Sequence, residues 1–313
     1  MQSLEARVTS GPPVLMDGAM GTELEVRGVP MDDSTWCGVA VATSPATVRE
    51  IHLDYMRIGA EIHIVNTYAS APHMLAWAGR ESEAEALNRA AVRLAQEARD
   101  AAQPDHPTWI AGSLSTFNGA NTDVLATERV RDSWRRQAEW LADSGCELLI
   151  LEMMLVNRRT LSYEQQGELL NIAHEIGLPV WYGISCKSDD GTSATLYEDV
   201  IVAKHGNPRD KGATFDSVVA AVDFDKVAAI GIMHSDVPAI APGLEVVRRH
   251  TDKPLLAYPN SGYFKMPQWQ FEGIIPVDEF VTEAQRWVAN GARIVGGCCG
   301  LGPEHIAGLH RNL

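Results

Sequence analysis

The sequence predicts an α/β fold of the (β/α)8 class, a TIM barrel that residues 1–313 form as a single domain. Eight short apolar runs alternate with amphipathic stretches of helical length. Most runs show little alternation of apolar and polar residues, as parallel strands do when both faces are covered. No Gly-x-Gly-x-x-Gly motif follows the first run and no phosphate-binding loop occurs, which disfavours a doubly wound sheet. Eight strand–helix units in one chain therefore favour the barrel.

The predicted strands are apolar runs of six to nine residues. Most of them are apolar throughout, so we expect them to lie between the barrel interior and a layer of helices. In chain order they are residues 14–19, 61–68, 108–115, 147–154, 179–187, 228–235, 254–262 and 293–300.

Amphipathic stretches between these runs predict the helices, over residues 45–59, 81–103, 127–145, 160–177, 236–250 and 277–291. Four of them end in glycine, as helix C-caps do: Gly59, Gly145, Gly177 and Gly291. Pro179 and Pro254 come just after helix ends, where a helix cannot continue. The longest stretch without a pattern, 188–213, is polar and rich in glycine and aspartate, and we expect an extended loop there.

Charge and cysteine content exclude some classes of partner. The chain has 26 basic and 41 acidic residues and a net charge of −15. Nucleic acids and anionic membranes attract basic patches, so we expect neither as a partner. No apolar run approaches the roughly 18 residues of a membrane span, and residues 1–10 lack the apolar core of a secretory signal. Five cysteines, an odd and sparse number, favour free or metal-bound thiols in a reducing compartment, and we predict the cytoplasm.

The most informative motif reads Val-Gly-Gly-Cys-Cys-Gly over residues 295–300. Its glycines allow a tight turn that lets both thiols face one point. Adjacent thiols of this kind suit a thiolate-binding metal, of which zinc is the commonest. The alternatives are two buried structural thiols or a vicinal disulfide. We predict a metal site that contains Cys298 and Cys299 at the end of the last strand.

In a (β/α)8 barrel the active site lies at the carboxyl ends of the strands. The polar side chains that end the predicted strands are therefore the candidate chemical groups. They combine carboxylates, an imidazole, a thiol pair and small hydroxyl or amide groups. They include Asp17, Thr67, Ser113, Glu152, Ser185, Cys186, His234, Asn260, Cys298 and Cys299.

Five motifs extend this pattern over nearly the whole chain. They are Met-Asp-Gly-Ala-Met-Gly-Thr-Glu-Leu over residues 16–24, Asn-Thr-Tyr over 66–68, Leu-Glu over 151–152, Tyr-Pro-Asn-Ser-Gly over 258–262 and Gly-Gly-Cys-Cys-Gly over 296–300. With these motifs the chain resembles the zinc-dependent homocysteine S-methyltransferases, which include betaine- and S-methylmethionine-dependent enzymes. The resemblance implies a methyltransferase with Zn²⁺ and no organic cofactor. Its small-molecule partners would be a sulfonium or quaternary ammonium methyl donor and a thiol, foremost homocysteine, which becomes methionine.

The resemblance also implies the metal ligands. The family's third zinc ligand is a cysteine in a Gly-x-Asn-Cys pattern at the end of strand six, where this chain reads Gly-Ile-Met-His over residues 231–234. His234 therefore joins Cys298 and Cys299 as the expected ligands, because imidazole is a competent zinc ligand. A site with two thiolates and a neutral histidine is less negative than one with three thiolates. A substrate thiol bound there is expected to be a weaker nucleophile.

By the same resemblance, Asp17 and Glu152 bind the amino group of the thiol substrate. Backbone groups near Gly18 and Ala19 bind its carboxylate. Three more residues lie at strand ends where they could orient the thiol or line the donor pocket: Thr67, Ser185 and Asn260.

Two other functions are alternatives. A zinc site with two cysteines and a histidine could activate water for hydrolase or lyase chemistry, or the chain could be a non-catalytic, thiol-binding barrel. Cys186 is a reserve candidate for the third ligand. Four aromatic side chains could hold an onium methyl group by cation–π contact: Tyr68, Tyr263, Phe264 and Trp269.

Overall fold

A computed structural model describes residues 2–116, 128–154, 163–196, 214–265 and 268–313. Each predicted strand has a counterpart in it. The barrel strands are β1 (Val14–Leu15), β2 (Ile62–Ile64), β3 (Trp109–Ser115), β4 (Leu148–Met154), β5 (Val180–Ile184), β6 (Ala229–Asp236), β7 (Leu255–Asn260) and β10 (Ala292–Val295).

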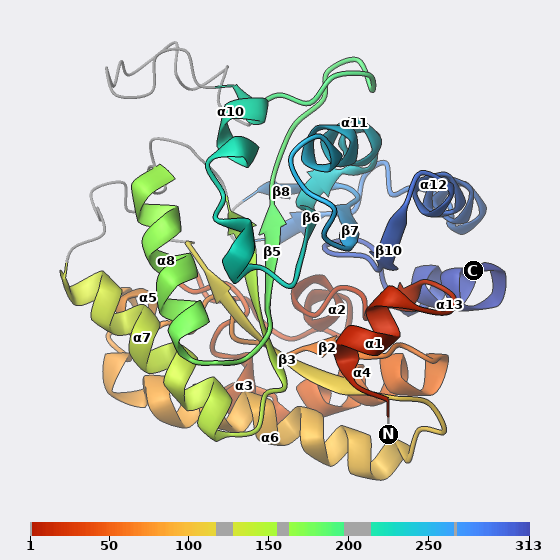
Figure 1. The fold of residues 1–313 in the computed structure, drawn as a ribbon. Coiled ribbons are helices and arrows are strands. Elements are labelled where there is room, and N and C mark those ends of the chain that lie inside the picture. Colours follow the sequence, from red (N-terminus) through yellow and green to blue (C-terminus); the bar gives the residue numbers. More distant parts are fainter. Residues whose placement is uncertain (1, 117–127, 155–162, 197–213, 266–267) are drawn as a thin grey trace.

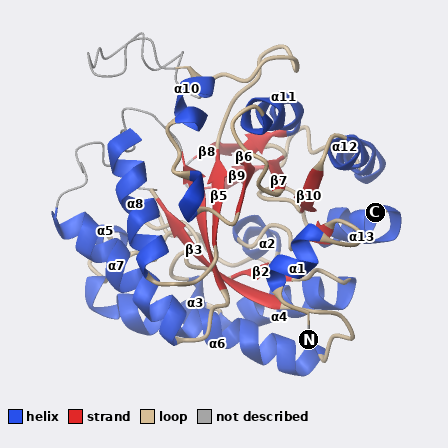
Figure 2. Cartoon of the chain, in the orientation of Figure 1, coloured by secondary structure: helices blue, strands red, loops and turns tan. Residues whose placement is uncertain are grey.

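These strands form one parallel sheet in the order β1-β10-β7-β6-β5-β4-β3-β2, and helices surround it (Figures 1 and 2). A parallel bridge between Met16 and Ile62 joins the two ends of this order. The sheet therefore closes, and the predicted (β/α)8 barrel is confirmed.

The main helices also match their predicted stretches. They are α4 (Pro45–Ile58), α6 (Ala84–Ala102), α7 (Glu128–Asp143), α8 (Tyr163–Glu175), α11 (Val237–Arg248) and α12 (Val277–Ala289). A further barrel helix was not predicted, α13 (Pro303–Asn312), nor was the hairpin formed by β8 (Tyr263–Lys265) and β9 (Gln268–Gln270). The short helical segments are α1 (Leu4–Thr9), α2 (Gly21–Val26), α3 (Ala40–Thr43), α5 (Pro72–Trp77), η1 (Glu81–Glu83), α10 (Phe215–Ala220) and η3 (Phe224–Lys226).

The predicted loop over 188–213 lies only partly within the described residues. Its first part folds back, since Thr195 pairs with Lys187 in an antiparallel bridge. Residues 197–213 lie outside the part of the chain that the structure describes. Within the described residues, no helix has the length and apolar character that crossing a membrane requires.

Two buried layers hold the barrel together. Strand residues that point outward pack against the helices, whereas those that point inward fill the interior of the barrel. The inward cluster extends from Leu4 and Val8 of α1 to Cys298 and Cys299. The interior is therefore packed, and the two cysteines lie in the inward layer, at the opposite end from α1.

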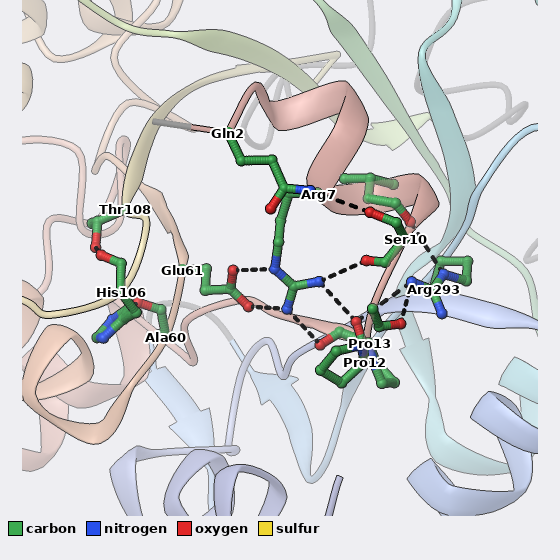
Figure 3. A network of polar contacts seen from close by, with 12 residues as sticks. Gln2, Arg7, Ser10, Pro12, Pro13, Ala60, Glu61, His106, Thr108 and Arg293 are labelled. Carbon is green, nitrogen blue, oxygen red and sulfur yellow. Dashed lines mark hydrogen bonds and ion pairs between the residues drawn. The ribbon is translucent and has the colours of Figure 1, made fainter.

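Helix α1 closes the amino-terminal end of the barrel. Its Arg7 forms a two-pronged ion pair with Glu61, with both N–O distances at 2.7 Å, and its Nη1 donates to the carbonyl oxygen of Pro12 at 2.8 Å (Figure 3). Glu61 directly precedes β2, and Pro12 comes shortly before β1. This network therefore ties α1 to the line along which β1 and β2 meet.

We expect Arg7→Ala to lower the free energy of unfolding by about 3 kcal/mol, because it leaves the nearly buried carboxylate of Glu61 without its partner. Urea denaturation followed by circular dichroism measures this. Arg93→Ala is the matched control, since Arg93 is exposed and pairs with Glu97 at 3.5 Å on the surface. Surface pairs contribute about 0–1 kcal/mol, so equal losses in the two variants would contradict the role given to Arg7.

Candidate active site

A small cavity of about 50 Å³ opens at the carboxyl ends of the strands. The residues that line it come from the segments after β1 and β2, from the loop around Trp36, from β7, from the ends of β4 and β6, and from the turn after β10. They include Gly18, Ala19, Trp36, Tyr68, Glu152, His234, Tyr258, Cys298 and Cys299. The structure therefore brings together both predicted thiols, the predicted histidine and one of the two predicted carboxylates.

The turn after β10 places both cysteines. The amide of Cys298 donates to the carbonyl of Pro259 at 2.7 Å, and the amide of Ser261 donates to the carbonyl of Cys299 at 2.9 Å. Gly300 has φ +79°, and a Cβ at that position would overlap the carbonyl oxygen of Ser261. Only glycine fits such a left-handed position so close to another backbone, so this turn needs the glycine that follows the thiols.

Cys298 lies between the two other predicted ligands. Its Sγ is 3.7 Å from Nδ1 of His234 and 3.8 Å from Sγ of Cys299. Zinc bonds of about 2.3 Å to sulfur and 2.0 Å to nitrogen, in tetrahedral geometry, place two sulfurs about 3.8 Å apart and sulfur and nitrogen about 3.5 Å apart. These two separations fit such a site. The third, between Cys299 and His234, exceeds 4.8 Å, so a bound zinc would have to draw these two side chains closer together.

His234 reaches the cavity through an irregular end of β6. The pairing of β6 with β7 shifts register between Met233 and Asp236, and His234 itself has φ +49°. Its Nε2 lies 2.8 Å from Oε2 of Glu152. Burial alone would lower the pKa of His234, but the nearby Cys298 and Glu152 raise it to about 10. The ring thus lies between Cys298 and Glu152, where negative charge on either neighbour favours its protonated form.

The thiol of Cys298 is held in its neutral form by its surroundings. The contact with Cys299 and the burial of the side chain raise the pKa of Cys298 well above its usual range, and His234 opposes this rise. Only the thiolate ligates a metal. A bound cation would replace the protons on these groups.

The other predicted carboxylate, Asp17, is buried beside the cavity. One of its oxygens accepts a hydrogen bond from the amide of Ile64 at 2.8 Å, and the other lies 3.1 Å from the hydroxyl of Tyr258, which lines the cavity. Burial raises the pKa of Asp17 well above its usual range, and these two hydrogen bonds oppose the rise. The sequence analysis did not predict that Tyr258 lines the cavity and contacts Asp17. Its position two residues after the inward-facing Leu256 nevertheless marks it as inward-facing.

The three remaining candidates lie elsewhere at the barrel mouth. The hydroxyl of Thr67 donates to the carbonyl of Ser113, and that of Ser185 donates to the carbonyl of Met233. Both hydroxyls therefore connect neighbouring strands. Asn260 borders a separate cavity of about 1030 Å³. The reserve ligand Cys186 packs in the outer layer, with its Sγ 3.5 Å from the carbonyl oxygen of Ala239.

A second group of ligand-type side chains lies deeper in the protein. Within the described chain, one trio of such residues has its ligand atoms all within 4.8 Å of one another: Asp17, His52 and His63. Burial lowers the pKa of His52 to about 4 and that of His63 to about 3, so both rings are neutral. The trio contains no thiol and all its members are buried. Among the described residues this trio lies away from the cavity lining, whereas the predicted ligands Cys298, Cys299 and His234 line the cavity.

Comparison with known proteins gives one consistent result. The family profile described as homocysteine S-methyltransferase matches residues 14–313. The chain is 29% identical to the selenocysteine methyltransferase of Astragalus bisulcatus, with 97% of this chain and 93% of that protein covered. It is also 29% identical to the homocysteine S-methyltransferase of Escherichia coli K12, with coverage of 95% and 94%. The metallated crystal structure of the homocysteine methyltransferase MmuM from Escherichia coli superposes with a TM-score of 0.74 at 26% identity, covering 98% of both chains.

Proposed function

Because the chain belongs to the homocysteine S-methyltransferase family and is a methyltransferase, we propose that it transfers a methyl group from an onium donor to homocysteine at a zinc site. The observation that carries this proposal is the grouping of Cys298, Cys299 and His234 around one cavity. Two sulfurs and one nitrogen leave a fourth tetrahedral position for a substrate sulfur.

We propose that zinc binds to Cys298, Cys299 and His234 at the cavity and not to the buried trio of Asp17, His52 and His63. Thiolates and imidazole are the ligands that zinc prefers, and an open position next to a cavity is typical of catalytic zinc sites. The trio of Asp17, His52 and His63 offers imidazoles but no thiolate, and none of its members lines the cavity. Bound by Cys298, Cys299 and His234, the metal would supply the charge that keeps a substrate thiol deprotonated at neutral pH.

The residues around this position divide the remaining work. We propose that Asp17 binds the ammonium group of homocysteine, whose positive charge would favour the ionised carboxylate against the effect of burial. A carboxylate oxygen can accept more than one hydrogen bond, so the contacts with Ile64 and Tyr258 can persist. Gly18 and Ala19, which line the cavity, offer backbone groups to the substrate carboxylate. Thr67 and Ser185 support this site as strand connections, and Asn260 lies on the side of the neighbouring cavity.

The donor is proposed to be a sulfonium or quaternary ammonium compound. The substrate sulfur attacks the methyl carbon, a new S–C bond forms, and the bond from that carbon to the positive sulfur or nitrogen breaks, so the donor leaves neutral. Trp36 and Tyr68 line the cavity, and aromatic faces attract such cations.

The five cysteines are free, which supports a reducing compartment such as the predicted cytoplasm.

Purified chain incubated with zinc under reducing conditions tests the proposal. We expect close to one zinc per chain by elemental analysis, and methionine formed from homocysteine with S-methylmethionine or betaine as donor. X-ray absorption at the zinc edge separates the two candidate sites, because sulfur neighbours occur only in the cysteine site. Absence of zinc, a shell of nitrogen and oxygen alone, or no transfer from either donor would overturn it.

We expect Asp17→Asn to weaken homocysteine binding by about 10- to 100-fold, because it replaces a charged hydrogen bond to the ammonium group by a neutral one. The amide still offers an oxygen to the backbone of Ile64. Calorimetric titration of the zinc-loaded variant with homocysteine measures the loss, and zinc content should not change. Asp54→Asn is the control, because Asp54 lies on α4, pairs with Arg27 and does not line the cavity. Equal affinity in wild type and Asp17→Asn would remove Asp17 from the substrate site.

A further inference from the structure

One contact at the site has a role beyond those above: the hydrogen bond between His234 and Glu152. We propose that Glu152 is a positioning residue for the metal ligand, and that it holds the ring of His234 so that Nδ1 faces Cys298 and the metal. The inference rests on the proposed function, because it assigns Glu152 to a zinc ligand. It gives Glu152 a task that is needed before any substrate arrives.

The geometry selects one tautomer of the ring. Nε2 of His234 lies 2.8 Å from Oε2 of Glu152, whereas Nδ1 lies 3.7 Å from Sγ of Cys298. An ionised carboxylate accepts hydrogen bonds and cannot donate one, so the N–H of a neutral ring belongs on Nε2, next to Glu152. The lone pair then lies on Nδ1, on the side of the thiols. Histidine ligands commonly donate their other N–H to a carboxylate in this way, which fixes the ring and makes it a stronger donor.

The backbone is distorted at both partners of this contact. The pairing of β4 with β5 shifts register between Leu151 and Met154, and Met153 has φ +53°. The end of β6 shows the same combination at His234, as described above. Positive φ at residues other than glycine is strained and persists only where the surroundings hold it. Such irregularities re-aim side chains at strand ends, and here they bring together residues from β4 and β6, two strands that β5 separates.

A second side chain fixes the plane of the same ring. Tyr68 stacks on His234, with ring centroids 5.4 Å apart and planes 23° apart, and its hydroxyl lies 2.8 Å from Sδ of Met153. The side chains of His234 and Glu152 are only 11% and 6% exposed. Stacking thus restrains the tilt of the ring, the carboxylate restrains its rotation, and little water competes for either contact.

Zinc affinity measured without homocysteine separates this role from that of an ammonium anchor, because an anchor affects only amino-acid binding. A competition titration against a chromogenic zinc chelator is run on wild type, Glu152→Ala and Glu152→Gln, and on His234→Cys with and without Glu152→Ala. We expect Glu152→Ala to weaken zinc binding by about 10- to 100-fold. Glu152→Gln should recover most of this loss, because its amide oxygen still accepts the hydrogen bond from Nε2. In the His234→Cys background, Glu152→Ala should change zinc affinity by less than about threefold, since the ring it positions is gone.

Thermal unfolding of the metal-free proteins checks that each variant folds, and ¹⁵N NMR of the zinc-loaded wild type should place the ring proton on Nε2. Zinc binding by Glu152→Ala as tight as in wild type would overturn the inference and leave the proposed function standing. The inference would also be overturned if Glu152→Ala weakened zinc binding as much in the His234→Cys background as in the wild type, or if the ring proton of His234 lay on Nδ1. Absence of zinc from the wild type would overturn the proposed function itself, and this inference with it.

Discussion

Cys298→Ser and Cys299→Ser are each expected to lose bound zinc and to slow methyl transfer by at least about 1000-fold. A serine hydroxyl is a far weaker zinc ligand than a thiolate, and a metal ion contributes several kcal/mol to catalysis, with about 1.4 kcal/mol for each factor of ten. The change is isosteric, so the turn after β10 should persist. Elemental analysis and methionine formation are measured on the same preparations.

Cys146→Ser is the control for both variants. Cys146 is also a buried free thiol, but it follows α7 and lies outside the cavity. Its substitution should lower stability slightly and leave zinc content and transfer rate at the wild-type level. Full zinc content in either Cys298→Ser or Cys299→Ser would contradict the proposed ligand set.

His234 should give the second largest effect, with opposite signs for two substitutions. His234→Ala removes a ligand, so zinc affinity should fall by more than the roughly 100-fold expected for losing an outer-shell partner. His234→Cys creates a site with three thiolates, which should hold zinc more tightly and make a bound thiol a stronger nucleophile. The transfer rate at saturating zinc should therefore rise in His234→Cys and collapse in His234→Ala.

Zinc titration and single-turnover transfer with the same donor across the three proteins provide the test. Each variant is first checked for folding by its far-ultraviolet circular dichroism. If His234→Ala kept full zinc occupancy and the wild-type rate, His234 would not be a ligand. Cys186 would not replace it, because its thiol packs in the outer layer against Ala239.

The barrel was predictable because its signal repeats along the chain. Each strand is an apolar run, and an amphipathic stretch was predicted after six of the eight runs, so a misplaced boundary in one unit does not change the count. Helix α13 lacks such support, because it has only ten residues and includes Gly308. The hairpin of β8 and β9 is equally local, and its strands are three residues long.

The thiol pair was predictable for a similar reason, since adjacent residues in a glycine turn must lie close together. The contact between Glu152 and His234 was not, because it depends on distortions at the ends of two strands that are not neighbours in the sheet. The directions of small hydroxyl groups were also beyond prediction. Thr67 and Ser185 come after β2 and β5, but their hydroxyls bond to carbonyl groups of adjacent strands.

The closure of the barrel has a consequence for how the protein moves. The described contact between β1 and β2 is a single bridge, at Met16 and Ile62, where other neighbouring strands share ladders. The ion pair between Arg7 and Glu61 stabilises this contact at the amino-terminal end of the barrel. At the other end, the carboxylate of Asp17 stabilises it by accepting a hydrogen bond from the amide of Ile64. Local opening of the barrel should occur most easily between β1 and β2, because such opening breaks the weakest set of hydrogen bonds first. Asp17, which is proposed to bind the amino group of the substrate, thus also joins β1 to β2. We therefore expect substrate binding to change how often the barrel opens between these two strands.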